Sequence, residues 1–218
     1  MEIDPAALSN SRRYRLLISA VVPRPIAFVS TRSRDGHDNL APFSFYMGVG
    51  SEPPMIALSV SSRDGALKDT AKNLDETGEF IVHSATEELA HAVNEASGDW
   101  APEVDEFART GLTKAKAARV AVPRVAEAKL ALECRVHTVV PLGTAPHDVR
   151  LVVGEVVWIH VDDAVLEDAP AAAGAADAVS AAPLVDPLRL RPLARLGKNL
   201  YTTLGTLLAL DRPRPPKR

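Results

Sequence analysis

The sequence predicts a mainly β protein that folds as a barrel with a few helices. About six to seven short segments rich in β-branched and aromatic residues are separated by turn signals such as Asp35-Gly36. One of them, Met55–Ser61, alternates apolar and polar side chains with the period of two that indicates a strand. Few helical segments lie between these strands, which favours a barrel over a doubly wound α/β sheet.

The first predicted element is a helix over residues 7–21. Ser9 or Ser11 can cap its N-terminus, and apolar residues recur within it at helical spacing. The helix should end before Pro23, because proline cannot continue a helix and restricts the residue that precedes it.

A hairpin is predicted next, with strands over 26–31 and 39–46 joined through Asp35-Gly36. The residues that follow, up to Glu52-Pro53-Pro54, are interpreted as turn material before the strand at 55–61.

The same signals predict the rest of the chain. We expect a helix over 68–77 ended by Gly78, a strand over 79–84, a helix over 87–96, an irregular stretch over 98–126 with one or two short helices, and two paired strands over 129–140 and 151–161. We also expect one domain over 1–210 with an alanine-rich surface insertion at 164–187, partly ordered, and a disordered basic tail at 211–218.

The composition limits the possible partners. The chain has 218 residues and a net charge of −3, so no global charge attracts nucleic acid or an anionic membrane. The single cysteine, Cys134, excludes an internal disulfide framework and multi-cysteine metal sites, and favours a cytoplasmic location. No apolar run approaches the roughly 18–20 residues that span a bilayer, and no secretory signal is visible at the N-terminus.

Several common catalytic motifs are absent from the sequence. It lacks the Gly-x-Gly-x-x-Gly motif of dinucleotide-binding domains and the Walker A motif of phosphate-binding loops. It also lacks the Gly-x-Ser-x-Gly motif of serine hydrolases and the His-Glu-x-x-His motif of zinc proteases. Cys134 and His137 cannot share a metal ion, because side chains three apart on a strand point to opposite faces.

A candidate phosphate site follows the strand at 55–61. It combines two cations with hydroxyl groups near the start of the predicted helix at 68–77, where free backbone N–H groups favour an anion. Its residues are Ser59, Ser61, Arg63, Lys68 and Thr70. The alternative is a solvated loop in which Asp69 or Thr70 only caps the helix.

A second candidate stretch is Asn39–Phe45. Pro42 lacks an N–H group, which predicts an edge strand or a bulge whose freed neighbouring N–H groups could bond a ligand. Phe43 and Phe45 could equally be core residues. His83 lies on a predicted strand and faces either a ligand or the core.

An ordered set of motifs resembles the flavin reductase-like family. The motifs span residues about 8 to 162, with a further match at Leu196–Leu204. They are Pro23-Arg-Pro-Ile-Ala-Phe-Val-Ser-Thr31, Asn39-Leu-Ala-Pro-Phe-Ser-Phe45, Glu52-Pro-Pro54, Lys68-Asp-Thr70, Gly78-Glu-Phe-Ile-Val82, Val104-Asp-Glu-Phe107, Leu132-Glu-Cys134 and Gly154-Glu-Val156.

The resemblance implies a six-stranded split β-barrel that binds FMN near the interface of a homodimer. It places the isoalloxazine ring on Asn39, Ala41, Pro42, Phe43, Ser44 and Phe45, and the ribityl chain and phosphate on Ser59, Ser61, Arg63, Lys68 and Thr70. Asn199 and Tyr201 would approach from the C-terminal segment or the partner subunit. The family usually has Asn where this chain has His83, which would change contacts near the flavin.

The resemblance also implies a reaction, hydride transfer from NADH or NADPH to flavin, with reduced flavin passed onward, for example to a flavin-dependent monooxygenase. The cofactor performs this chemistry, so no catalytic side chain is expected. Two alternatives remain open: an electron carrier without its own nicotinamide site, and an FMN-dependent oxidase of a small substrate.

Overall fold

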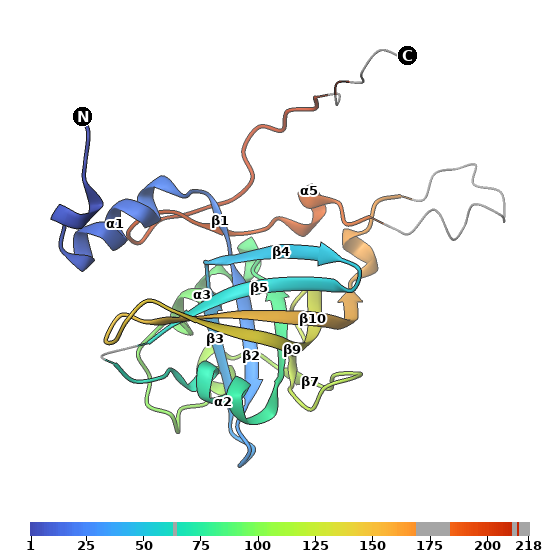
Figure 1. The fold of residues 1–218 in the computed structure, drawn as a ribbon. Helices are drawn as coiled ribbons and strands as arrows, with labels where there is room; N and C mark the ends of the chain where they lie inside the picture. The colour runs from blue at the N-terminus through green and yellow to red at the C-terminus, as the bar shows by residue number, and fades with distance from the viewer. Residues whose placement is uncertain (63–64, 169–183, 211–212, 214–218) are drawn as a thin grey trace.

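An antiparallel sheet dominates the computed structural model, which describes residues 1–62, 65–168, 184–210 and 213 (Figure 1). Within these residues the sheet has seven strands in the order β3-β2-β6-β9-β10-β5-β4. The strands are β2 (Ala27–Arg32), β3 (Asp38–Phe43), β4 (Tyr46–Ser51), β5 (Pro54–Ser61), β6 (Glu79–Ser84), β9 (Leu130–Leu142) and β10 (Val149–Val161).

The sheet closes on itself because its two edge strands are consecutive in the chain. Only Ser44 and Phe45 separate β3 from β4. The Ser59 N–H donates to the Phe45 carbonyl over 2.9 Å, and β4 then pairs with β5. The chain therefore crosses from one edge to the other and bends the sheet into a barrel.

The barrel interior is apolar, and one helix contributes to it. The helices are α1 (Asn10–Ala20), α2 (Asp69–Thr77), α3 (Ala90–Glu95), α4 (Glu106–Thr110) and α5 (Pro187–Leu190), with 3-10 turns η1 (Pro5–Ala7), η2 (Glu87–Leu89) and η3 (Asp163–Val165). Ala71 and Leu74 of α2 pack against Phe80 and Val82 of β6 inside the barrel. Gly78 ends α2 with φ 66°, a left-handed conformation that glycine adopts without strain.

A second apolar cluster covers the outside of β2 and β3. Phe28 and Leu40 contribute from these strands, while Val93 and Phe107 contribute from α3 and α4. The cluster holds α3 and α4 against the edge of the barrel, where the segment between them borders a polar cavity.

Short strands pair a segment near the N-terminus with the C-terminal segment. They are β1 (Arg24–Pro25), β11 (Ala194–Arg195) and β12 (Tyr201–Thr202), with a separate pair β7 (Lys114–Ala115) and β8 (Arg124–Val125). Buried Arg24 donates to the carbonyls of Ile18, Val21 and Leu196. It thus satisfies carbonyls at the C-terminal end of α1 and ties that helix to the C-terminal segment.

The fold confirms the mainly β prediction and most of the predicted elements. The strands predicted at 26–31, 55–61, 79–84, 129–140 and 151–161 and the helix predicted at 68–77 all form within a few residues of the expected bounds. Ser9, rather than Ser11, caps α1. Pro42 lies on the edge strand β3, as its missing N–H group predicted.

Two predictions at the barrel edge were wrong. The strand expected over 39–46 ends at Phe43, and the expected turn material before Glu52 is strand β4. The sequence of β4 has two glycines and mostly exposed side chains, so it lacks the apolar–polar alternation that would predict a strand. It is a strand because it pairs with β5. The helix predicted over 87–96 divides into η2 and α3, and the irregular 98–126 contains α4 and the β7–β8 pair.

The expected insertion and tail fall mostly outside the described residues. Positions 169–183 and most of 211–218 are not described, so the prediction of poor order there is untested. The flanks of the insertion meet, since Leu166 and Val185 form an antiparallel bridge. In the described part of the chain, no helix has the length and apolar character required to cross a membrane.

Candidate functional site

A small polar cavity brings together part of each predicted stretch. It has a volume of about 110 Å³ and lies between β3, the start of α2 and the segment that joins α3 to α4. Six residues predicted from the sequence line it, namely Asn39, Ala41, Pro42, Phe43, Lys68 and Thr70. The other lining residues are Asp69, Ala96, Ser97, Gly98, Trp100 and Glu106.

The side chain of Asn39 orients the hydroxyl of Thr70. Asn39 Nδ2 donates to Thr70 Oγ1 over 3.0 Å and to Thr31 Oγ1 over 3.3 Å. Thr31 Oγ1 also accepts from Asn73 Nδ2 of α2 over 3.0 Å. Because Thr70 Oγ1 accepts from Asn39, its own proton remains available as a donor. Asn39 therefore acts at the helix end of the cavity through its side chain.

The first turn of α2 forms one wall of the cavity. Lys68 is the N-cap residue with extended backbone, and Thr70 is buried. N–H groups at the start of a helix lack intrahelical partners and carry partial positive charge, so this wall attracts an anion. Asp69 forms an ion pair with Lys72 over 2.9 Å.

The edge of β3 offers fewer donors than its proline suggested. The Leu40 N–H donates to Glu106 Oε2 over 3.1 Å, away from the β2 partner strand. Alternation along the strand turns Pro42 to the same edge, where it has no N–H to offer. Over Leu40 to Pro42, this edge presents carbonyl acceptors. The expectation that Pro42 frees donors nearby is therefore wrong for this stretch.

Of the last three predicted ring residues, Ser44 and Phe45 lie beside Arg24 and Phe43 does not. Phe43 lines the cavity but is buried in the barrel core, which was the alternative interpretation. Ser44 Oγ accepts from Arg24 Nε over 3.2 Å. Phe45 is partly exposed, with the Arg24 guanidinium 5.9 Å from its ring centre.

The remaining predicted residues that the structure describes do not line the polar cavity. Ser59 and Ser61 lie on β5, and Asn199 is exposed in the C-terminal segment. The Tyr201 hydroxyl donates to Asn94 Oδ1 of α3 over 3.2 Å. Arg63 lies outside the described residues.

Glu106 and Trp100 line the cavity and were not predicted. Burial raises the pKa of Glu106, while its hydrogen bond from Leu40 opposes that shift. Trp100 Nε1 donates to the Glu95 carbonyl over 3.0 Å, and Arg109 stacks 3.3 Å from its ring centre. The motif Val104-Asp-Glu-Phe107 was the available signal for Glu106, but nothing local linked it to Asn39.

His83 is buried and its ring nitrogens bond the backbone of two other residues, although the residue also borders the larger cavity described below. It is fully buried, and the Val125 N–H donates to its Nε2 over 2.9 Å. Nδ1 therefore carries the proton and donates to the Phe28 carbonyl over 2.9 Å. Burial lowers the pKa of His83 to about 4, so the ring is neutral at physiological pH.

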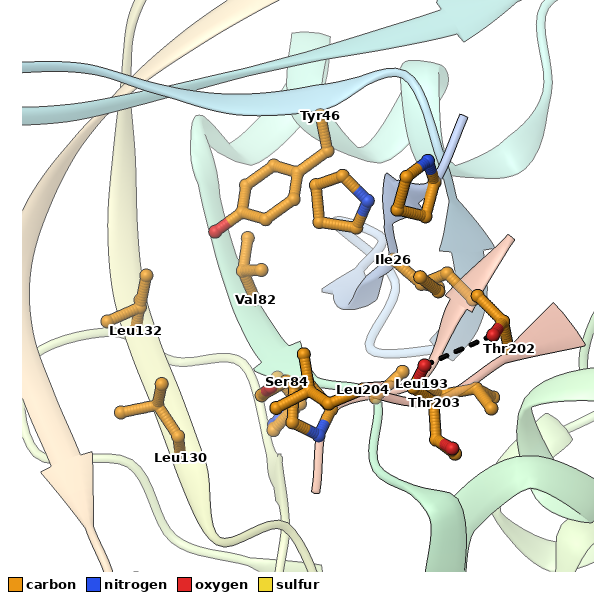
Figure 2. Close-up of a pocket in the computed structure, with 16 residues that line it drawn as sticks. Ile26, Tyr46, Val82, Ser84, Leu130, Leu132, Leu193, Thr202, Thr203 and Leu204 are labelled. Carbon is orange, nitrogen blue, oxygen red and sulfur yellow. Dashed lines mark hydrogen bonds between the residues drawn. The ribbon is translucent and has the colours of Figure 1, made fainter. Parts of the chain in front are cut away.

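A larger, mostly apolar cavity of about 320 Å³ lies at the barrel mouth (Figure 2). Leu130, Leu132 and Val82 line one side, and the C-terminal segment with Leu204 lines the other. Tyr46 also faces it, and burial raises the pKa of its phenol to about 12. None of the residues predicted to bind the cofactor lines this cavity within the described chain.

Comparison with known proteins decides the family. The model of the flavin reductase like domain matches residues 19–185. The chain belongs to the flavin reductase-like family. The uncharacterized protein BH2278 of Halalkalibacterium halodurans is 41% identical over 216 residues, which cover 98% of this chain and 97% of that protein.

Solved structures of similar fold agree with this family membership. Nitrilotriacetate monooxygenase component B from Bacillus cereus is 31% identical, with a TM-score of 0.87 over 96% of this chain and 98% of that chain. A split-barrel-domain protein from Shewanella frigidimarina, 22% identical, gives a TM-score of 0.77 over 96% of each chain. This flavin reductase-like protein therefore has the split-barrel fold that its motifs implied, and its described sheet has seven strands where six were expected.

Proposed function

We propose that this protein is an FMN-dependent NAD(P)H:flavin oxidoreductase. The observation that carries the proposal is the polar cavity, in which Lys68 and the Thr70 hydroxyl meet the start of α2 next to the edge strand β3. Membership of the flavin reductase-like family supports the same cofactor class.

The cavity fits the phosphate end of FMN. An ammonium group, a hydroxyl with an available proton and helix N-terminal N–H groups are the donors that a phosphate requires. Asn39 holds the Thr70 oxygen and leaves its proton to the ligand. On the opposite side, Ser44 and Phe45 continue from β3 toward Arg24, where the flat ring would extend.

In this proposal, the protein binds and orients while the cofactor reacts. Bound FMN would supply the chemistry by accepting a hydride from reduced nicotinamide and passing the electrons on. Lys68 and Thr70 would hold the phosphate, Asn39 would orient Thr70, and β3 would place the ring through its carbonyl groups. The Arg24 guanidinium would contribute positive charge beside Ser44.

The electron acceptor would be a separate flavin-dependent monooxygenase. The similar Bacillus cereus protein is component B of nitrilotriacetate monooxygenase. We infer that this chain supplies reduced flavin to a partner enzyme. A cytoplasmic location belongs to the same proposal and rests on the single, buried Cys134.

We also propose that the protein works as a homodimer. Every residue of α1 is at least partly exposed, including Tyr14 and Leu17. Met47 and Val49 on β4 are 58% and 49% exposed. Apolar side chains on a helix and an edge strand favour association with a second copy.

The proposed function is tested by turnover. Purified protein with added FMN should oxidise NADH or NADPH in air, measured as loss of nicotinamide absorbance. Turnover with neither nicotinamide would contradict the reductase assignment. Bound flavin without turnover would favour the electron carrier, and oxygen uptake that depends on another small substrate would favour the oxidase.

The phosphate assignment predicts a selective effect of Lys68→Ala. The affinity for FMN should fall about tenfold, while that for riboflavin should change less than about twofold, because only FMN carries the phosphate. Titration followed by flavin fluorescence measures both affinities. Lys116→Ala removes the same charge from an exposed position outside the cavity lining and serves as the control. Equal losses for FMN and riboflavin would contradict the assignment.

A further inference from the structure

Glu106 places a buried carboxylate in the wall of the polar cavity. The residue is 8% exposed, and its Oε2 accepts the Leu40 N–H over 3.1 Å. A carboxylate has several acceptor positions, and the backbone N–H groups of Leu40 and of Glu106 itself use only part of them. A buried charge is costly unless further donors reach it. The cavity side of Glu106 therefore suits a ligand that donates hydrogen bonds.

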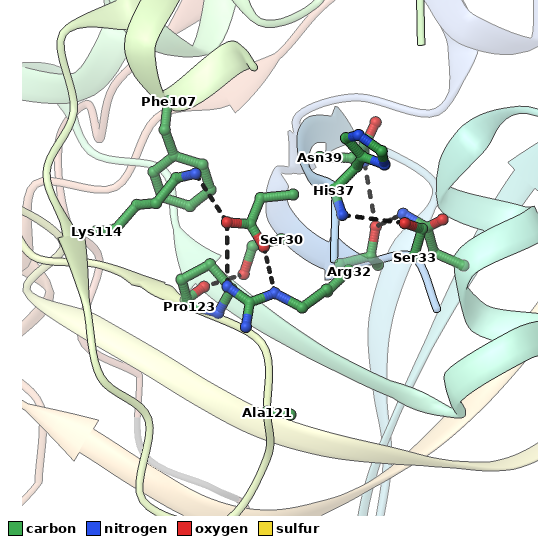
Figure 3. Close-up of polar contacts among 12 residues, drawn as sticks. Ser30, Arg32, Ser33, His37, Asn39, Phe107, Lys114, Ala121 and Pro123 are labelled. Carbon is green, nitrogen blue, oxygen red and sulfur yellow. Dashed lines mark hydrogen bonds and ion pairs between the residues drawn. The ribbon is translucent and has the colours of Figure 1, made fainter. Parts of the chain in front are cut away.

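The helix that carries Glu106 is clamped against β3. Lys114 Nζ lies 2.7 Å from Asp38 Oδ2, at the start of β3, and 2.7 Å from Asp105 Oδ2, the N-cap residue of α4. Its ammonium also lies 5.3 Å from the ring centre of Phe107, and Figure 3 shows these two side chains together. Glu106, between Asp105 and Phe107, is therefore held in place beside Leu40.

The two walls of the cavity have opposite chemistry. Lys68, Thr70 and the start of α2 are donors that attract a phosphate. Glu106 is an acceptor with negative charge, so it repels a phosphate and attracts hydroxyl groups. In a ligand that carries a phosphate at one end, the matching group beside Glu106 is an uncharged polyol chain.

We propose that Glu106 recognises the polyol chain of the flavin by accepting hydrogen bonds from its hydroxyl groups. This assignment rests on the proposed function and adds a binding residue to it. Glu106 would then bind the part of the cofactor between the ring and the phosphate, while Lys68 and Thr70 would bind the phosphate itself.

Three flavins separate this role from the alternatives. FMN has ring, polyol and phosphate, riboflavin lacks the phosphate, and lumiflavin lacks both polyol and phosphate. In Glu106→Gln the amide oxygen can still accept from Leu40, but the charge is lost. The affinity for riboflavin should fall about tenfold, that for FMN somewhat less because the repulsion of its phosphate is lost as well, and that for lumiflavin less than about twofold, measured by fluorescence titration.

Two further variants serve as a control and as a substitute for Glu106→Gln. Glu127→Gln makes the same change at an exposed carboxylate that also accepts a backbone N–H, from Thr113, and should alter none of the affinities. If Glu106→Gln does not yield soluble protein, Glu106→Asp withdraws the carboxylate by one methylene and should show the same order of losses.

Two results would overturn the assignment. Equal losses for all three flavins would show that Glu106 only holds β3 in place. A change for FMN alone would show that its charge acts on the phosphate. Wild-type protein that binds none of the three would instead overturn the proposed function, and the Glu106 assignment with it.

Discussion

His83 holds three strands together through one neutral ring. It lies on β6, donates to the Phe28 carbonyl of β2 and accepts from the Val125 N–H of β8. Protonation at Nε2 would break the Val125 bond and bury a charge. The residue that departs from the family pattern is thus a structural residue of the barrel wall.

This burial predicts that stability falls in mildly acidic solution. The unfolded chain binds a proton at His83 below its ordinary pKa of 6.5, whereas the folded chain does so only near 4. The stabilisation is therefore full above about pH 6.5 and is lost as the pH falls toward about 4, by up to roughly 3 kcal/mol. Denaturant unfolding across this window measures it.

The matched variant is His83→Gln. It should be less stable than wild type at neutral pH, because it loses the bridging ring, and it should show a shallower decline between pH 6.5 and 4. The same slope in both proteins would show that other groups carry the pH dependence.

Among the elements, the α4–β3 contact determines the shape of the site. Lys114 bridges Asp38 and Asp105, while Glu106 bonds Leu40. These contacts cover the outer edge of β3, which an exposed edge strand otherwise offers to other chains. The same contacts give the cavity its second wall.

The insertion is bounded by a short antiparallel pair. The Glu167 N–H donates to the Leu184 carbonyl and the Asp186 N–H to the Val165 carbonyl, each over 2.8 Å. Since its flanks already meet, residues 168–183 should be replaceable by a two-residue Asn-Gly turn, with the melting temperature changed by less than about 2 °C. Thermal unfolding checks this, and loss of soluble protein would show that the removed segment packs against the barrel.

At the scale of the whole molecule, exposed apolar side chains lie on α1, on β4 and in the C-terminal segment. Figure 1 shows α1 and the C-terminal segment beside the β4 side of the barrel. Leu200, Leu207 and Leu208 in that segment are exposed. A second copy would cover this surface, and the barrel-mouth cavity adjoins it through Leu204.

The dimer prediction is tested with Met47→Asp combined with Val49→Asp. Wild type should have the mass of two chains in light scattering after size exclusion, and the double variant the mass of one, because burying two carboxylates costs several kcal/mol. Leu142→Asp, an exposed apolar position at the far end of β9, should leave the mass unchanged. A monomeric wild type would contradict the proposal.

Local signals in the sequence determined most of the elements and half of the residues that line the polar cavity. Period-two alternation predicts β5, glycine at its left-handed position predicts the end of α2, and Pro42 predicts an edge strand. Lys68 and Thr70 were found because a helix start, a cation and a hydroxyl are neighbours in sequence. These features depend on residues only a few positions apart.

The tertiary structure alone decided the features that join distant residues. Strand β4 exists because β5 pairs with it, and Asn39 reaches Thr70 because β3 passes beside α2. Glu106 meets Leu40 across 66 positions, and His83 meets Val125 across 42. A carboxylate or an imidazole looks the same in sequence whether it is solvated or buried, and only folding determines which groups lose water and which partners replace it.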